Sequence, residues 1–225
     1  MQDTEAKFYV CTWDDNSDCT HCAASSGLHC KWDQNILTGF IATSIPPYLL
    51  FILGMVMVGI MTRVWWPLIV YIAFLVGFFG FFEIRILCSH CPYYAGDQKS
   101  LKCLANNGAL KLWSFHPGPM NTFERTSLVV GFALIYAVFP LAIQGYGIWF
   151  IASQYASYGL IALLGMIGVV AAGMLLTFVF FAVLRIFFCS ACINFSCPLN
   201  TVPEEMIDAY LDKNPVMREA WKKTG

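Results

Sequence analysis

The sequence predicts an all-α integral membrane protein, a four-transmembrane-helix bundle built from two helical hairpins, with a small Cys-rich cytoplasmic cap. Hydrophobic residues make up 58% of the 225 residues and charged residues only 12%, which excludes an ordinary soluble domain. Four apolar stretches are each long enough to cross a bilayer core of about 30 Å. All ten cysteines lie outside these stretches.

The elements follow one another in a regular order. We expect spans at residues 36–62, 64–87, 127–152 and 157–188, with no basic residue inside them before Arg85 and Arg185. The first thirty-five residues are polar and Cys-rich, without the basic-then-apolar pattern of a signal peptide, so we expect no cleavable leader. The chain then divides into a Cys/His-rich N-terminal cap (1–35), a first transmembrane hairpin (36–87), a Cys-containing loop (88–126), a second hairpin (127–188) and a Cys-containing tail with short amphipathic helices (189–225).

The positions of Lys and Arg predict the orientation. Arg63 is the one basic residue in the link between the first two spans, and the link at residues 153–156 has none. Every other Lys and Arg lies in the segments on the opposite side, which the positive-inside rule assigns to the cytoplasm. We therefore expect a multi-pass protein of the cytoplasmic (inner) membrane with both termini inside. The expected partners are the lipid bilayer and another protein or a second copy of the chain, and not nucleic acid.

Two capping boxes and an amphipathic tail are also predicted. Asn121 with Glu124 is typical of the start of a helix, here the third span, and Thr201 with Glu204 predicts a second capped helix. Apolar residues recur at helical spacing over 202–213, and a shorter amphipathic piece follows Pro215. These tail helices either lie on the membrane surface or dock on the cysteine-rich segments.

The cysteines carry the strongest chemical signal. There are three Cys-x2-Cys pairs, each followed by a third cysteine, and two of the pairs repeat the pattern Cys-Ser-x-Cys at a helix end. Two thiolates at this spacing reach one metal from a tight turn, and clustered cytosolic cysteines are more often metal ligands or catalytic thiols than disulfides. The expected metal ligands are Cys11, Cys19, Cys22, Cys30, Cys88, Cys91, Cys103, Cys189, Cys192 and Cys197.

The grouping of these ligands stays open. A four-thiolate site made by the pairs at 88–91 and 189–192 would join the second span to the fourth. The N-terminal cysteines would need a further ligand, such as Cys11 or His29. His21 and His90 lie inside Cys-x-His-Cys motifs, and we expect their side chains to point away from a metal.

Three function classes fit these features. The first is iron–sulfur electron transfer toward quinone or a partner subunit, with the chain as an electron-transfer subunit of a membrane oxidoreductase. The second is a membrane scaffold or binding protein with structural zinc sites. The third is a thiol–disulfide oxidoreductase. Iron–sulfur cluster and zinc use the same thiolates, so the sequence does not separate them, and a quinone is a further candidate cofactor.

Three charged residues near the helix ends are candidate cofactor-binding residues. Arg85 and Arg185 each precede a Cys-Ser-x-Cys motif by about one turn and would offset the charge of thiolates there. The alternative is that both are ordinary positive-inside residues whose side chains extend to lipid headgroups. Glu83 is the one acidic residue inside a span. It is either a partner for a basic residue or a proton-relay or quinone-site residue.

Overall fold

The computed structural model describes residues 10–14, 17, 22, 24 and 27–223. Within these residues the secondary structure is helical apart from an isolated antiparallel bridge between Ser100 and Leu110. Four helical runs are long and apolar enough to cross a membrane: Gln34–Thr62, Trp66–His90, Thr122–Ser153 and Tyr155–Phe188. The prediction of an all-helical protein with four apolar spans is thus confirmed. The third run begins five residues earlier than expected.

Three of the four runs contain a π-helical turn, which lies inside the second and third runs and at the end of the fourth. The first run is a single helix, α1 (Gln34–Thr62). The others are composite: α2 (Trp66–Gly77), η2 (Phe78–Phe82) and α3 (Glu83–Ile86); α4 (Thr122–Ala133), η5 (Leu134–Val138) and α5 (Phe139–Ser153); α6 (Tyr155–Val183) and η6 (Leu184–Phe188). The π-helical turns are η2, η5 and η6, and such turns are frequent at functional sites.

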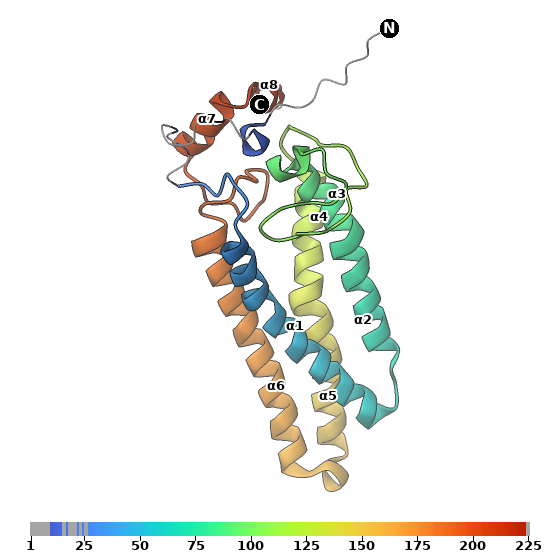
Figure 1. The fold of residues 1–225 in the computed structure, drawn as a ribbon. Helices are drawn as coiled ribbons and strands as arrows, with labels where there is room; N and C mark the ends of the chain where they lie inside the picture. The colour runs from blue at the N-terminus through green and yellow to red at the C-terminus, as the bar shows by residue number, and fades with distance from the viewer. Residues whose placement is uncertain (1–9, 15–16, 18–21, 23, 25–26, 224–225) are drawn as a thin grey trace.

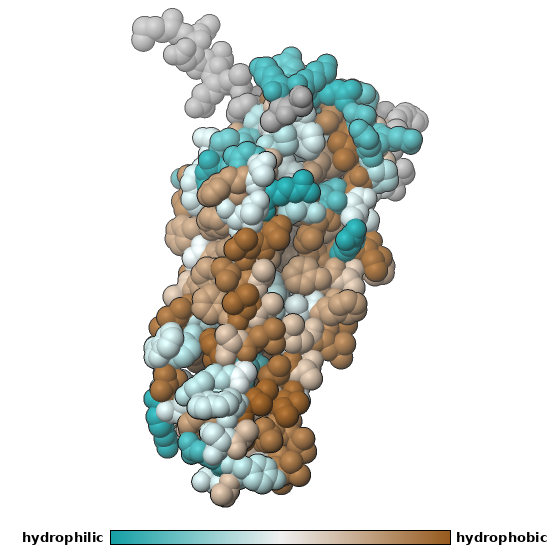
Figure 2. All heavy atoms as spheres, turned by 180° about the vertical axis from the view of Figure 1, so that it is seen from behind, coloured by the Kyte–Doolittle hydropathy of each residue, from teal (hydrophilic) through white to brown (hydrophobic). Residues whose placement is uncertain are grey.

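The remaining described chain gathers at one end of the helices, which we call the loop end (Figure 1). It comprises the described residues before α1, residues 87–121 and residues 189–223. It contains the short helices η1 (Cys11–Trp13), η3 (Cys88–His90), η4 (Pro92–Ala95), α7 (Glu204–Asp212) and α8 (Pro215–Lys222). Hydrophobic residues cover most of the helical body, whereas hydrophilic ones gather mainly at the loop end (Figure 2). This distribution fits a protein in a lipid bilayer.

Helix α1 packs against α5 and α6, and small residues allow the close approach. A Cβ atom on Gly54 of α1 would lie 2.5 Å from the side chain of Gln144 on α5. Gln144 is 1% exposed, and its Nε2 donates a hydrogen bond to the Phe51 carbonyl at 3.1 Å. An amide buried among apolar helices needs such a partner, so this bond fixes α5 against α1.

One predicted capping box is present and the other is not. Asn121 accepts from the Glu124 amide at 2.9 Å while Glu124 Oε2 accepts from the Asn121 amide at 3.0 Å, as predicted. The predicted box of Thr201 and Glu204 is wrong, because α7 starts at Glu204 itself with Pro203 as its N-cap. Thr201 therefore lies before the first turn, and its hydroxyl donates to the Arg185 carbonyl at 3.4 Å instead.

The tail helices dock on the cysteine-rich segments, one of the two arrangements that the sequence allows. Tyr210 of α7 and Met217 of α8 are each 1% exposed and belong to an apolar cluster that also contains Cys88, Cys91 and Cys103. The Tyr210 hydroxyl shares a hydrogen bond of 2.8 Å with Thr12. The helices α7 and α8 thus cover the loop end and pack it against the N-terminal segment.

A cysteine-lined cavity as the candidate functional site

The first Cys-Ser-x-Cys motif forms a tight turn where the second run ends. The Cys91 amide donates to the Cys88 carbonyl at 2.9 Å, which closes the 3₁₀ turn η3. The Ser89 hydroxyl donates back to the Arg85 carbonyl at 2.5 Å. These bonds use the last carbonyls of the helix and place both thiols of the motif at its end.

The second motif lies beside the first. The Cys189 amide donates to the Leu184 carbonyl at 2.7 Å, a bond across the π-helical turn η6. Downstream, Asn194 is 6% exposed, and its Nδ2 donates to the Leu87 carbonyl at 3.0 Å. This bond joins the loop after the fourth run to the end of the second run. The two motifs, about a hundred residues apart in the sequence, therefore face one space.

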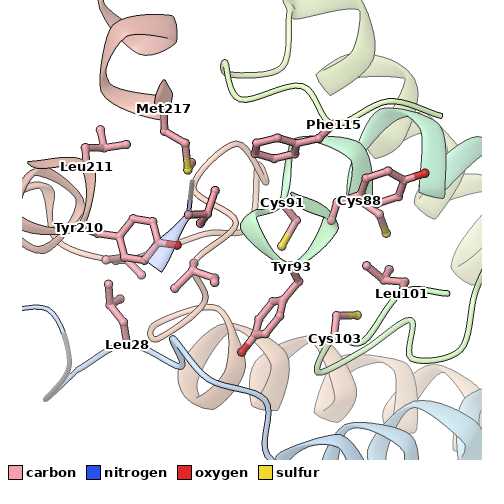
Figure 3. Packing of buried hydrophobic residues seen from close by; sticks show 14 of the residues in the cluster. Leu28, Cys88, Cys91, Tyr93, Leu101, Cys103, Phe115, Tyr210, Leu211 and Met217 are labelled. Carbon is pink, nitrogen blue, oxygen red and sulfur yellow. The ribbon is translucent and has the colours of Figure 1, made fainter. Parts of the chain in front are cut away.

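That space is a cavity of about 320 Å³. Cysteines from three separate segments line it: Cys88 and Cys91 after the second run, Cys103 in the central loop, and Cys189, Cys192 and Cys197 after the fourth run. In Figure 3, Cys88 and Cys91 extend from one turn, and Cys103 extends from a neighbouring loop next to Tyr93. Thus six of the ten expected metal ligands surround one cavity.

Four of these cysteines share a local geometry. The sulfur of Cys103 accepts the Ala105 N–H and that of Cys192 accepts the Asn194 N–H, each at 3.4 Å. The backbone N–H groups of Tyr93 and Leu199, again two positions later, act to lower the pKa of Cys91 and Cys197. The Asn106 amide adds a second donor to Cys103 at 3.0 Å, whereas the Asn200 amide donates to the Cys197 carbonyl at 3.0 Å. A backbone N–H directed at sulfur stabilises the negatively charged thiolate. Neither Cys88 nor Cys189 has such a donor among the described residues.

The same four thiols also interact with one another. Cys91 interacts electrostatically with Cys192, Cys103 and Cys197, and Cys192 interacts with Cys103 and Cys197. Cys189 interacts in the same way with Cys197 and Cys192, and Cys88 with Cys103 and Cys91. We call Cys91, Cys103, Cys192 and Cys197 the inner four, with Cys88 and Cys189 as flanking cysteines.

Without a bound cation these thiols are held protonated. Burial raises the pKa of Cys103 and of Cys192 to about 11, against the N–H donors that lower it. Burial and the neighbouring thiols raise the pKa of Cys197 to about 12 and that of Cys91 well above its usual range. The pKa of Cys189 rises to about 12 for the same reasons, and Arg185 opposes this only weakly. A thiol in this state is a poor nucleophile.

The cavity continues from the cysteines into an apolar lobe between the helices. Its walls are aromatic side chains: Phe40, Tyr48, Phe79, Phe132, Tyr136, Phe180, Phe181 and Phe188. Each π-helical turn contributes to the lining, with Phe79 from η2, Tyr136 from η5, and Leu184 and Phe188 from η6. We call this region the aromatic lobe. The aromatic lobe adjoins the thiols, so a single cavity has cysteine sulfur atoms on one part of its wall and aromatic rings on the other.

Glu83 is buried between the two parts of the cavity. It is 7% exposed, and its Oε2 accepts from Asn106 Nδ2 at 3.1 Å. Among the described residues, Glu83 forms no ion pair with a basic side chain. Arg85, two residues further on, faces Glu124, with Nη1 and Oε1 3.7 Å apart. Helix geometry explains this, because residues two apart point in different directions.

The other candidate residues lie away from the cavity. Neither Arg85 nor Arg185 lines it, although Arg185 is close enough to lower the pKa of Cys189 slightly. Cys11, Cys22 and Cys30 do not line it and pack instead at the edge of the apolar cluster of the loop end. Cys19 and His21 lie outside the described residues. The described cysteines are therefore not equivalent, and Cys11, Cys22 and Cys30 are not part of the cavity lining.

The histidines have structural surroundings. The His90 Nδ1 is 2.7 Å from the Gly118 carbonyl, and its ring lies 5.5 Å from that of His116. His90 does not line the cavity. His29 does line it, while its amide donates to the Ala191 carbonyl at 2.7 Å. His29 thus joins the N-terminal segment to the second cysteine motif.

Several residues of the site are not evident from the sequence. Asn106, Asn194 and Tyr93 carry no recognisable motif, yet they hydrogen-bond sulfur or join the cysteine segments. The one local signal is that each sulfur acceptor stands two residues before its amide donor. In the part of the chain that the structure describes, no group of three His, Cys, Asp or Glu side chains is arranged to hold a single metal ion.

Comparison of the chain with protein-family models, with curated proteins and with solved structures found no match. The function must therefore be inferred from the chemistry of the cavity.

Proposed function

We propose that the chain is a membrane electron-transfer protein that holds an iron–sulfur cluster between the inner four cysteines. The observation that carries this proposal is their shared surroundings: Cys91, Cys103, Cys192 and Cys197 line one cavity, interact with one another, and each have a backbone N–H two positions later that favours the thiolate. Iron–sulfur clusters are held by four cysteine thiolates, and hydrogen bonds to sulfur tune their reduction potentials. This set differs from the four thiols at 88–91 and 189–192 that sequence spacing suggests.

The shape of the site favours a cluster over a zinc ion. Zinc ligands converge on a point, with sulfur about 2.3 Å from the metal. A cluster has volume of its own, so its cysteines stand around a space. The six thiols here line a cavity of about 320 Å³, and this cavity opens toward an apolar lobe within the helices. A structural zinc site does not require an adjoining apolar cavity. A redox centre must exchange electrons with a partner, and the lobe is a place where such a partner can bind.

The protonation of the thiols argues against a thiol–disulfide enzyme. Such enzymes need a cysteine with a lowered pKa in an electropositive and partly exposed place. Burial instead raises the pKa of Cys103 and Cys192 to about 11. A bound cation reverses this, because a coordinated thiol is deprotonated outright. The cavity thus suits thiols that become thiolates only when they bind iron.

The proposal includes the placement of the site. The two tight links, at residues 63–65 and 154, would face outward, and the two helical hairpins would carry the loop end as a cap in the cytoplasm. Support comes from the basic residues, since Arg63 alone lies on the linker side. The cluster would then stand at the cytoplasmic edge of the membrane, where a soluble carrier or a partner subunit can reach it.

Metal content and spectra of the protein purified without oxygen test this function. We expect iron and acid-labile sulfide in similar amounts, a broad visible absorbance band, and bleaching of that band on reduction. A colourless protein that contains zinc would contradict electron transfer and support a structural metal site. A protein without iron, zinc or sulfide after anaerobic purification would overturn metal binding altogether.

Single substitutions test the assignment of the ligands. Cys91→Ala, Cys103→Ala, Cys192→Ala and Cys197→Ala should each abolish the visible band and most of the iron. The matched controls are Cys88→Ala and Cys189→Ala, which remove flanking cysteines of the same cavity and should keep the band. Ser190→Ala controls for the Cys-Ser-Ala-Cys loop itself. Equal loss of iron in all six cysteine variants would contradict the inner-four assignment.

A further inference from the structure

We propose that the aromatic lobe of the cavity binds the ring of a membrane quinone. This inference deepens the proposed function, since it names the lipophilic redox partner of the cluster. It rests on the lobe's own residues for binding and on the proposed function only for electron exchange. The observations that carry it are the aromatic walls, one unused hydroxyl proton and a buried carboxyl group in the same space.

The walls suit a flat apolar ring. Eight aromatic side chains line the lobe, and several are held in fixed orientations by one another. The ring of Tyr136 stacks on Phe180 with centroids 5.7 Å apart and meets Phe181 edge-on at 5.0 Å. Aromatic walls bind planar rings by offset stacking and edge contacts. The whole cavity, cysteines and lobe together, has a volume of about 320 Å³, near the lower limit for small-molecule pockets, so the lobe is suited to a compact head group rather than a large ligand.

The tyrosine pair supplies a hydrogen-bond donor. The hydroxyls of Tyr48 and Tyr136 share one hydrogen bond, and the structure gives neither hydroxyl another partner among the described residues. Two hydroxyls have two protons, and their mutual bond uses one of them. The second O–H can therefore donate to an acceptor inside the lobe. A quinone carbonyl is such an acceptor, and it brings no charge into the apolar surroundings.

The carboxyl group of Glu83 supplies a second polar contact. Asn106 Nδ2 donates to its Oε2 at 3.1 Å, and no other hydrogen bond to this carboxyl group occurs among the described residues. The carboxyl also interacts electrostatically with both tyrosine hydroxyls, and all three side chains line the same cavity. A ligand with two carbonyls on opposite sides of a ring can reach more than one of these groups. Apolar walls with a few convergent polar groups are the general form of a small-molecule site.

Position within the fold supports the same ligand class. All eight aromatic wall residues belong to helical runs that can cross a membrane, and Ser44 of α1 lines the lobe as well. The lobe therefore lies among segments suited to the bilayer, the medium in which a lipophilic ligand dissolves. The inner four cysteines line the other part of the same cavity, so ring and cluster would lie side by side without an intervening helix.

Binding is tested with the full chain in lipid nanodiscs and a quinone with one isoprene unit as the probe. Equilibrium dialysis measures saturable binding above the partition into empty nanodiscs. We expect a single site, with the Kd about five- to tenfold higher in the double variant Tyr48→Phe/Tyr136→Phe, the effect of losing one hydrogen bond. The matched control is Tyr71→Phe, because Tyr71 is also buried but bonds the Ile135 carbonyl at 3.2 Å away from the lobe.

A second variant tests the lobe without changing the tyrosine hydroxyls, in case the double tyrosine variant does not fold. Ser44→Phe would fill the lobe beside α1 without removing a polar group from the Tyr–Glu set, and it should abolish saturable binding. Iron is measured in the same samples, so the two proposals fail separately. Iron with no saturable quinone binding would overturn this inference alone. Quinone binding without iron would overturn the cluster alone. An unchanged Kd in the double tyrosine variant would show that the tyrosine hydroxyls do not donate to the quinone.

Discussion

The side-chain amide of Asn106 donates to Glu83 Oε2 at 3.1 Å, and the same nitrogen lies 3.2 Å from Cys88 Sγ. The backbone amide of Asn106 donates to Cys103 Sγ at 3.0 Å. One loop residue thus connects the acidic residue of the second span with two thiols of the cavity. It fixes the central loop over the end of the helices.

Removal of this amide should destabilise the fold. Asn106→Ala leaves Glu83 buried without its hydrogen-bond partner, and an unsatisfied buried polar group costs about 1–3 kcal/mol. We expect a lower midpoint of thermal unfolding in detergent, measured by circular dichroism on metal-free protein. Asn107→Ala is the matched control, because Asn107 is exposed on the same loop. Equal midpoints for the two variants would show that the Asn106 bonds contribute nothing.

A second prediction concerns helix packing. A Cβ on Gly131 would lie 2.0 Å from the ring of Phe78, which is itself enclosed by Phe79 and Phe132 at centroid distances of 5.2 and 5.5 Å. Because the ring has no free space to move into, Gly131→Ala should cost about 1–3 kcal/mol. Unfolding in detergent by increasing sodium dodecyl sulfate measures the loss. Gly145→Ala is the control, since nothing lies within 4 Å of its added Cβ, and a similar loss there would refute the packing argument.

The sequence predicts the helices well because lipid leaves few alternatives. A span needs about 20 apolar residues with every backbone group satisfied, and this requirement is visible in composition alone. The capping box of Asn121 and Glu124 is equally local and is confirmed. The box of Thr201 and Glu204 fails because Pro203 occupies the N-cap position, a detail that the box pattern does not weigh.

The sequence predicts only part of the site. The Cys-x2-Cys pairs indicate which residues matter, but their grouping depends on three segments meeting in space. Spacing suggests Cys88 and Cys189 as ligands, whereas the backbone N–H groups that act to lower a pKa are found at Cys103 and Cys197. The π-helical turns that shape the aromatic lobe have no signal in an apolar run, because hydrophobicity does not distinguish helix types.

The thiols of the cavity should react slowly when no metal is bound. Burial raises the pKa of Cys103 and of Cys192 from 9.0 to about 11, so few of them are thiolate at pH 8. Alkylation by N-ethylmaleimide, followed by mass spectrometry of the metal-free protein, should accelerate about tenfold per pH unit between pH 8 and 11. Rapid alkylation at pH 7, as in denatured protein, would instead support a thiol–disulfide enzyme.

The same shifts predict how stability depends on pH. A thiol whose pKa is raised on folding stabilises the folded state below its ordinary pKa, and this contribution is lost as the pH rises through the folded value. The metal-free protein should therefore lose stability between pH 9 and about 12, as Cys189 and Cys197 ionise more readily in the unfolded chain. Thermal unfolding measured across this range tests the sign. A midpoint that rises with pH would contradict it.

The last prediction concerns Glu124, which links the third run to the first cysteine turn. Its Oε2 accepts the capping bond from the Asn121 amide, and its Oε1 lies 3.7 Å from Arg85 Nη1. Glu124→Gln keeps an acceptor for the Asn121 amide and loses the charge that faces His90 and Arg85, of which the partly exposed pair with Arg85 contributes at most about 1 kcal/mol. Glu124→Ala also removes the reciprocal bond of the capping box, while Asn121 Oδ1 still accepts from the amide of residue 124, and should cost a further ~0.5–1.5 kcal/mol.

The difference between these two variants isolates the cap from the ion pair. Thermal unfolding of both, beside the exposed control Glu219→Ala, gives the two contributions, and added salt should weaken only the part lost in Glu124→Gln. Because the cap orients the start of α4 against His90, whose Nε2 lies 3.5 Å from Glu124 Oε2, the alanine variant should also loosen the turn between Cys88 and Cys91. Hydrogen exchange of the Cys91 amide measures that loosening, and unchanged exchange in a destabilised Glu124→Ala protein would confine the role of Glu124 to its own helix.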